Sequence, residues 1–304
     1  MSVFARDAPV RQLFSLFLIT WFFGMVLYFF FSTLSYLFIF DHRTFEHPRY
    51  LKNQIRLEMG VAVASLPQMA IVTAVCFLAE VRGYSKLYRS VDQYGWGYFI
   101  FQFPLFLLFT DSLIYLIHRG LHSKALYKHL HKPHHRWIMP TPYASHAFHP
   151  ADGFLQSLPY HIFPFIFPLH RFAYIALFSF VNIWTVLIHD GEYLSNDPII
   201  NGAACHSLHH LKFSCNYGQF TTLFDRLGGS YVPPNPELFD KALNKASWKK
   251  QAQEVDAIRK EIGEIEDTPN QPLEATLIER ESVFQDKSST FTSAIKKKAQ
   301  VAGR

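Results

Sequence analysis

Four long apolar runs, separated by polar connections, occupy most of the first 190 positions of the chain. They cover residues 13–40, 59–79, 96–117 and 153–188. As helices, the first three are long enough to cross a hydrocarbon core about 30 Å thick. The pattern therefore predicts an all-α integral membrane protein with about four apolar membrane regions.

The fourth run differs from the others because prolines interrupt it. Pro159, Pro164 and Pro168 lie inside it, followed by His170 and Arg171. Each half is short for a full span, and a proline breaks or kinks a helix. Two arrangements fit this pattern: a hairpin that enters the membrane and returns, or one long broken span.

Composition and charge point to a membrane surface. The chain is 49% hydrophobic and carries a net charge of +5. Its basic residues lie between the apolar runs, and five of them follow the third run: Arg119, Lys124, Lys128, Lys132 and Arg136. Positive connections favour the cytoplasmic side of a membrane. No nucleic-acid motif accompanies the charge, and three cysteines without a CxxC pair do not predict a disulfide framework.

Eight histidines form three tight groups beside the apolar runs. The spacings are H-x3-H, H-x2-H-H and H-x2-H-H, at His118 and His122, at His131, His134 and His135, and at His206, His209 and His210. Imidazole is the commonest protein ligand for transition metals. Eight ligands are twice what one tetrahedral ion needs. The simplest interpretation is a site for two metal ions at the edge of a bilayer.

Four other residues are candidates for completing or supporting this site. His146, His149 and His189 could bind metal or orient a ligand, and the alternative is an ordinary capping or core histidine. Asp111 lies within the third run, seven residues before His118 and on the same helix face. A carboxylate within a span usually has a partner, so we expect Asp111 to accept a hydrogen bond from a ligand imidazole. A bond to Ser112 is the alternative.

The residue types narrow the choice of metal without deciding it. Imidazole suits zinc, copper, iron and nickel. A structural zinc site needs four ligands and often cysteines, and a haem needs an axial ligand rather than eight histidines. Two irons that activate dioxygen fit the ligand count and leave open positions for oxygen.

Longer motifs make the pattern specific. The strings HRGLH, LHKPHH, PTPYASHAFHPADGFLQS, NIWTVLIHDGEYLS and NYGQFTTLFDRLGGSY fall between residues 101 and 231. This region resembles the membrane fatty acid hydroxylase / sterol desaturase superfamily, and the strings resemble its C-5 sterol desaturase (lathosterol oxidase) branch, with the fungal ergosterol-pathway enzymes as the first relatives to compare. All eight histidines of the family pattern are present and correspond to its metal ligands.

The resemblance implies a fold, a reaction and partners. It implies a catalytic domain with a helical histidine-box metal centre facing the cytosol (101–232). The apolar runs before this domain predict an N-terminal transmembrane region (1–100), and the composition after it predicts a polar, partly disordered tail (233–304). Such enzymes lie in the endoplasmic reticulum membrane and bind two irons. They take electrons from NAD(P)H through cytochrome b5 and its reductase, reduce O2, and dehydrogenate the C-5/C-6 bond of a delta-7 sterol.

Other functions remain open from the residues alone. A sterol C-4 methyl oxidase or another lipid hydroxylase would use the same centre, because substrate placement decides between desaturation and hydroxylation. A membrane metal transporter or sensor is the alternative without catalysis. A transporter should place its ligands deep within spans, whereas these histidines lie at span ends and in connections. In the tail, we expect an exposed charged helix over 248–266 and disorder from Thr268 onward.

Overall fold

The computed structural model describes residues 5–261 and 263. The longest helices are α1 (Pro9–Phe38), α2 (Gln54–Val81), α3 (Gly95–Leu121), α5 (Pro150–Ile166), α6 (Arg171–Ile188) and α9 (Lys241–Glu261). Shorter ones are η1 (His42–Glu46), η2 (Val91–Gln93), α4 (Lys124–Leu126), η3 (Tyr127–His131), η4 (Pro142–His146), α7 (Ala203–Lys212), α8 (Leu223–Leu227) and η5 (Pro236–Phe239). The chain divides after Val255 into two units, and the helices that carry the histidines all belong to the first.

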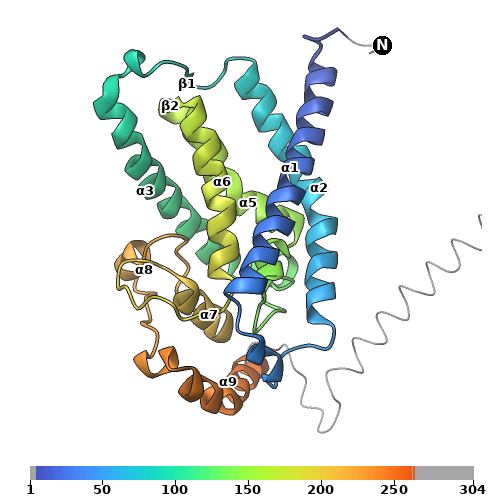
Figure 1. Cartoon of the computed structure of the whole chain (residues 1–304), viewed down its shortest axis with the longest axis vertical. Helices are drawn as coiled ribbons and strands as arrows, with labels where there is room; N and C mark the ends of the chain where they lie inside the picture. The colour runs from blue at the N-terminus through green and yellow to red at the C-terminus, as the bar shows by residue number, and fades with distance from the viewer. Residues whose placement is uncertain (1–4, 262, 264–304) are drawn as a thin grey trace, which may run out of the picture. The chain divides into compact units, whose positions relative to one another are not determined.

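Within the described part of the chain, four helices are long and apolar enough to cross a membrane: α1, α2, α3 and α6. Large side chains such as Phe14, Phe22 and Phe30 of α1 are more than half exposed, which suits a surface covered by lipid. Figure 1 shows α1 beside α2 and α6, and these pairs are in contact. The prediction of an all-α, multi-pass membrane protein is confirmed.

The proline-rich fourth run forms a helical hairpin. Pro159 and Pro164 lie inside α5, and Pro168 lies in the short link before α6. The link carries β2 (Leu169–His170), which pairs in parallel with β1 (Leu87–Tyr88). Since α5 and α6 run in opposite directions, both ends of the hairpin return to the end of the bundle where α3 finishes (Figure 1). Of the two arrangements open from the sequence, the structure has the hairpin.

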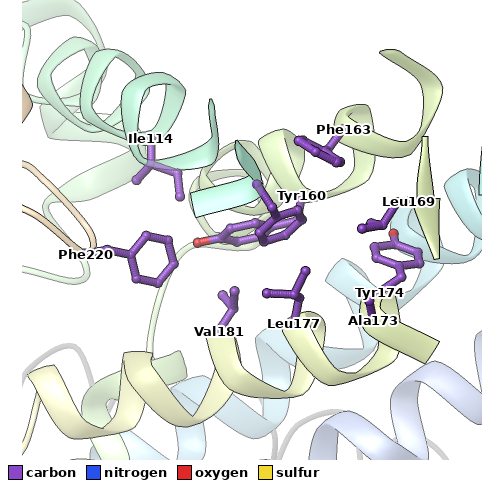
Figure 2. Close-up of a cluster of buried hydrophobic side chains, with 10 residues drawn as sticks. Ile114, Tyr160, Phe163, Leu169, Ala173, Tyr174, Leu177, Val181 and Phe220 are labelled. Carbon is purple, nitrogen blue, oxygen red and sulfur yellow. The ribbon is translucent and has the colours of Figure 1, made fainter. Parts of the chain in front are cut away.

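A cluster of buried side chains holds α3, α5 and α6 together (Figure 2). Phe106 of α3 meets Phe163 of α5 edge to face, with ring centroids 5.0 Å apart, and both side chains are fully buried. Leu177 and Val181 of α6 complete this contact. In lipid, helices associate through such close packing rather than through a hydrophobic driving force. The cluster therefore fixes the helices on which the histidine-bearing segments are built.

The polar tail begins with a packed helix, which corrects one expectation. The sequence predicted an exposed charged helix over 248–266, but Trp248, Ala252 and Val255 of α9 are buried. Their spacing places them on one helix face, so a charged helix still buries an apolar stripe. The disorder expected from Thr268 onward falls outside the described residues.

Candidate metal centre

The three histidine groups of the sequence regroup in space into two sets, with one added member. In each set, the possible ligand nitrogens all lie within 4.8 Å of one another. The first set is His118, His122, His131, His135 and His209, and the second is His134, His189, His206 and His210. Segments more than 90 residues apart in the chain thus converge on two adjacent points.

Helical spacing explains how α3 and α7 contribute. His118 lies in the last turn of α3, and His122, four residues later, caps the end of that helix. Both rings therefore lie on one face, with their centroids 5.3 Å apart. On α7, His206 and His210 are also four apart and share the second set. His209 projects about 100° away from His210 and joins the first set. One helix therefore supplies both sets.

The middle group is carried by a turn rather than by a regular α-helix. The chain forms a π-helical turn at Tyr127–His131 and then further turns. The Lys132 amide closes the π turn by donating to the Tyr127 carbonyl. Such wide turns are rare and often occur at functional sites. This turn sends His131 and His135 to the first set and His134 to the second.

Hydrogen bonds on the outer side of the first set fix its ring tautomers. Nδ1 of His118 donates to the carbonyl of Tyr217 at 2.9 Å, and Nδ1 of His209 donates to the carbonyl of Cys215 at 2.7 Å. A carbonyl oxygen can only accept, so the proton lies on Nδ1 and the inward Nε2 carries a lone pair. The tautomers of these rings are therefore suited to metal binding through Nε2.

His131 is oriented by a carboxylate. Its Nδ1 lies 2.7 Å from Oδ2 of Asp152, a fully buried residue at the start of α5. This is the arrangement in which a carboxylate holds a ligand imidazole and raises its basicity. Asp152 was not predicted from the sequence. One signal could have found it: it is the only acidic residue between Asp111 and Asp190.

The inward nitrogens then face one another at close range. Nε2 of His118 lies 3.1 Å from Nε2 of His131, and the His118 nitrogen carries a lone pair because its Nδ1 donates outward. Nε2 of His209 is buried and has no hydrogen-bond partner among the described residues. The donor set therefore fits a bound metal ion.

The second set repeats this geometry around His189. Its Nδ1 donates to the carbonyl of Thr185 at 2.6 Å, which leaves a lone pair on Nε2. That Nε2 lies 3.0 Å from Nε2 of His206 and 3.3 Å from Nε2 of His134. Nε2 of His206 in turn lies 3.2 Å from Nε2 of His210. The structure thus brings His189 into contact with the predicted histidines.

Burial keeps these imidazoles in the form that binds metal. Burial lowers the pKa of each of five rings well below its ordinary value, and the neighbouring imidazoles lower it further. These rings are His134, His135, His206, His209 and His210. The rings are neutral at pH 7 as a result. Metal binding then requires no proton to be removed from them.

The other predicted candidates lie outside both sets. His146 contacts Asn182, with 3.2 Å between Nε2 and Oδ1, and His149 caps α5 by accepting from the Ala151 amide. Their described contacts correspond to the alternative considered for them, a core and a capping histidine.

Asp111 bonds to a loop instead of an imidazole, which corrects the expected contact. Its carboxylate accepts hydrogen bonds from the amides of Gln219, Phe220 and Thr221 and from the Thr221 hydroxyl. This loop follows Tyr217, whose carbonyl holds His118. Asp111 therefore supports the histidine centre indirectly, by fixing the loop that orients the ring of His118.

Comparisons with known proteins agree with this picture of an α-helical membrane protein built around a histidine centre. The fatty acid hydroxylase family model matches residues 103–230. The chain is 61% identical over 265 residues to the Delta(7)-sterol 5(6)-desaturase ERG3A of Gibberella zeae, covering 86% of this chain and 76% of that protein. It is 58% identical over 276 residues to a probable Delta(7)-sterol 5(6)-desaturase of Neurospora crassa, covering 90% and 80%.

A third relative gives a similar result. The Delta(7)-sterol 5(6)-desaturase erg31 of Schizosaccharomyces pombe is 56% identical over 260 residues, covering 85% of this chain and 87% of that protein. No solved structure matches the chain. The chain belongs to the fatty acid hydroxylase / sterol desaturase superfamily, in its C-5 sterol desaturase branch, as the motif strings indicated.

Proposed function

We propose that this chain is an oxygen-dependent delta-7-sterol C-5(6) desaturase of sterol biosynthesis, in the ergosterol pathway, and that its two histidine sets each hold one iron ion. The observation that carries the proposal is the convergence of the imidazoles into two adjacent sets. The names of the relatives, all Delta(7)-sterol 5(6)-desaturases, support the substrate and the bond.

The chemistry of the substrate explains why such a centre is needed. The C–H bonds at C-5 and C-6 offer neither an acidic proton nor a leaving group, so side-chain acid–base catalysis cannot break them. When bound, the irons would supply the oxidising power. One turnover removes two hydrogens from the sterol, takes two electrons and two protons from outside, and reduces O2 to two waters.

The chain's own residues hold and orient the centre. His118, His131 and His209 keep their protons on the outer Nδ1 atoms, so their inward Nε2 atoms serve as ligands. Asp152 holds the ring of His131. In the second set His189 joins His206 as a ligand, and its proton is held by the Thr185 carbonyl. The eight box histidines and His189 are the proposed ligands.

The same proposal assigns a location and a source of electrons. The enzyme lies in the endoplasmic reticulum membrane with the histidine sets on the cytosolic side. The exposed basic residues that follow α3, including Lys124 and Lys128, favour that orientation. Electrons come from NAD(P)H through cytochrome b5 and its reductase, as the membership of the sterol desaturase branch implies.

The test is a product assay with purified protein. The protein is incubated with a delta-7 sterol, O2 and reduced cytochrome b5, and the sterols are separated and identified. A conjugated 5,7-diene, seen by its near-ultraviolet absorption, is the expected product. An alcohol would point to a hydroxylase or a C-4 methyl oxidase of the same superfamily instead. Metal binding without any sterol product would favour the transporter or sensor.

A further inference from the structure

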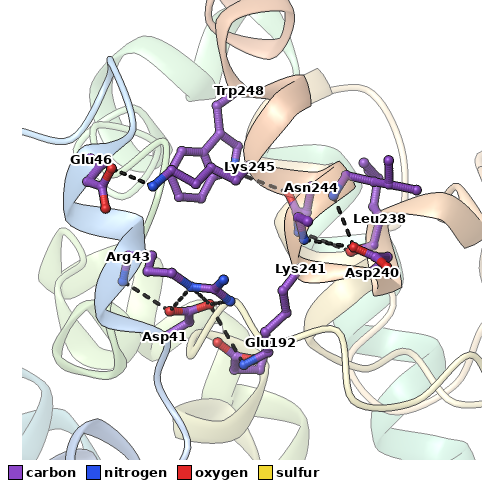
Figure 3. Close-up of polar contacts among 12 residues, drawn as sticks. Asp41, Arg43, Glu46, Glu192, Leu238, Asp240, Lys241, Asn244, Lys245 and Trp248 are labelled. Carbon is purple, nitrogen blue, oxygen red and sulfur yellow. Dashed lines mark hydrogen bonds and ion pairs between the residues drawn. The ribbon is translucent and has the colours of Figure 1, made fainter.

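The helix α9 lies outside the matched family region, yet it is fastened to the body of the protein. Its residues up to Val255 belong to the first unit, and Val255 is 1% exposed. The ring of Trp248 packs edge to face on the buried His47, with centroids 5.6 Å apart. A second tie is the ion pair of Lys245 with Glu46, 2.6 Å long (Figure 3). The position of α9 is therefore defined by both apolar and polar contacts.

The first turn of α9 places one lysine between two carboxylates from distant parts of the chain. Nζ of Lys241 lies 3.2 Å from Oε2 of Glu192 and 3.7 Å from Oδ2 of Asp41 (Figure 3). Asp41 follows α1, and Glu192 follows α6. Arg43 also bonds Asp41. Lys241 therefore joins the connections that leave two membrane-spanning helices.

Glu192 connects this contact to the second histidine set. It is three residues after His189, and its amide donates to Oδ1 of Asp190 at 2.9 Å. Gly191, between Asp190 and Glu192, has φ +72°, a conformation that residues other than glycine rarely adopt. Glu192 is only 7% exposed, so its carboxylate needs a compensating charge, and Lys241 supplies one.

We propose that α9 acts as a clamp on the turn that follows α6, and that Lys241 is a positioning residue for His189 in the second metal site. The proposal rests on the proposed function in one respect: His189 must be a ligand. It extends the working unit beyond the histidine boxes and the matched region, into the polar tail. The first metal site should not depend on this clamp, because its described supports are Tyr217, Cys215 and Asp152.

The test measures metal release from each site separately. In a His131→Ala background only the second set is complete, and in a His206→Ala background only the first. Lys241→Met is introduced into each, and the release of bound iron to a chelator is timed. In the His131→Ala background we expect iron release to become about two- to fivefold faster, the size of effect expected for a partly exposed ion pair. In the His206→Ala background the rate of iron release should be unchanged.

Two variants control for general effects on α9. Lys250→Met removes an exposed lysine of the same helix whose described partner is Glu254, and it should release iron at the parent rate. Lys241→Arg keeps the charge and should restore the parent rate. Equal acceleration in both backgrounds, or the same effect from Lys250→Met, would overturn the proposal in favour of a general role in stability.

A second readout needs neither iron nor activity. In metal-free protein, hydrogen–deuterium exchange of residues 189–193 should be about two- to fivefold faster in Lys241→Met than in the parent, because the Glu192 carboxylate loses the ion pair that holds this turn against α9. Unchanged exchange would overturn the clamp itself. If exchange responds but no iron is bound, the clamp stands and the proposed metal function fails.

Discussion

The two histidine sets are close neighbours, but they are supported differently. In the first, the outer nitrogens of His118, His131 and His209 are held by Tyr217, Asp152 and Cys215. In the second, His189 is held by a carbonyl of its own helix. Each set also has a ring whose Nδ1 has no partner among the described residues, His135 in the first and His134 in the second. The first set is thus oriented by tertiary contacts, and the second depends more on its helices and on the turn after α6.

This difference predicts how each set responds to change. A ring that is held by a distant loop keeps its direction when its own helix moves slightly. A ring that is held only within its helix moves with that helix. We therefore expect the first set to respond to substitutions in its supports, and the second to respond to changes in helix position.

Removing one ligand from either set should abolish the reaction. His131→Ala and His206→Ala each take away one proposed ligand, and we expect turnover to fall by at least about 100-fold, because both metal ions are needed. Iron content and diene production check this. His129→Ala is the matched control, because His129 is exposed and belongs to neither set. Full activity in either ligand variant would contradict the assignment.

Removing the carboxylate behind His131 should weaken only the first set. Asp152→Asn keeps the size of the side chain and removes its charge, and we expect iron affinity to fall about 10- to 100-fold at one site. Competition with a chelator measures the affinity of each site. The second site should bind as before. Equal weakening at both sites would show that Asp152 supports the fold rather than the ring.

Loosening the loop behind His118 should have a smaller effect. Asp111→Asn replaces one of the two carboxylate oxygens with an NH2 group, which cannot accept from the amides of residues 219–221, at a cost of about 1–3 kcal/mol in stability. Iron affinity of the first set should fall by less than in Asp152→Asn, because Asp111 acts on the ring only through the loop. Thermal unfolding and the same competition assay check both parts. Ser112→Ala serves as the control on the same helix, and a larger loss of affinity than in Asp152→Asn would contradict the order.

Ending the chain at Asp267 should have the smallest effect. None of the histidines or their described supports lies beyond that residue. Turnover and iron content should match those of the full chain. A loss of turnover or of iron would show that residues after Asp267 also support one of the two histidine sets.

Much of this arrangement could be predicted because local sequence determines it. The apolar runs gave three of the spanning helices to within a few residues, since length and hydropathy decide them. The H-x3-H spacing of His118 and His122 is enough to place both rings on one helix face, where the structure has them. The motif strings identified the family.

The rest depends on tertiary contacts that no local pattern contains. The division of the H-x2-H-H groups between two sets follows from a π-helical turn and from the placement of α7. Asp111 was expected to hold an imidazole because it shares a face with His118, but a loop 108 residues later takes its carboxylate. Asp152, which does hold an imidazole, is close to the histidine boxes only in space.

The two proposed iron sites are tested most directly by an experimental structure of the iron-loaded protein with anomalous scattering recorded at the iron edge. We expect two iron peaks in each chain, one bounded by the nitrogens of His118, His131 and His209, the other by those of His134, His189 and His206. A single peak, or iron bound away from these nitrogens, would contradict the proposed sites.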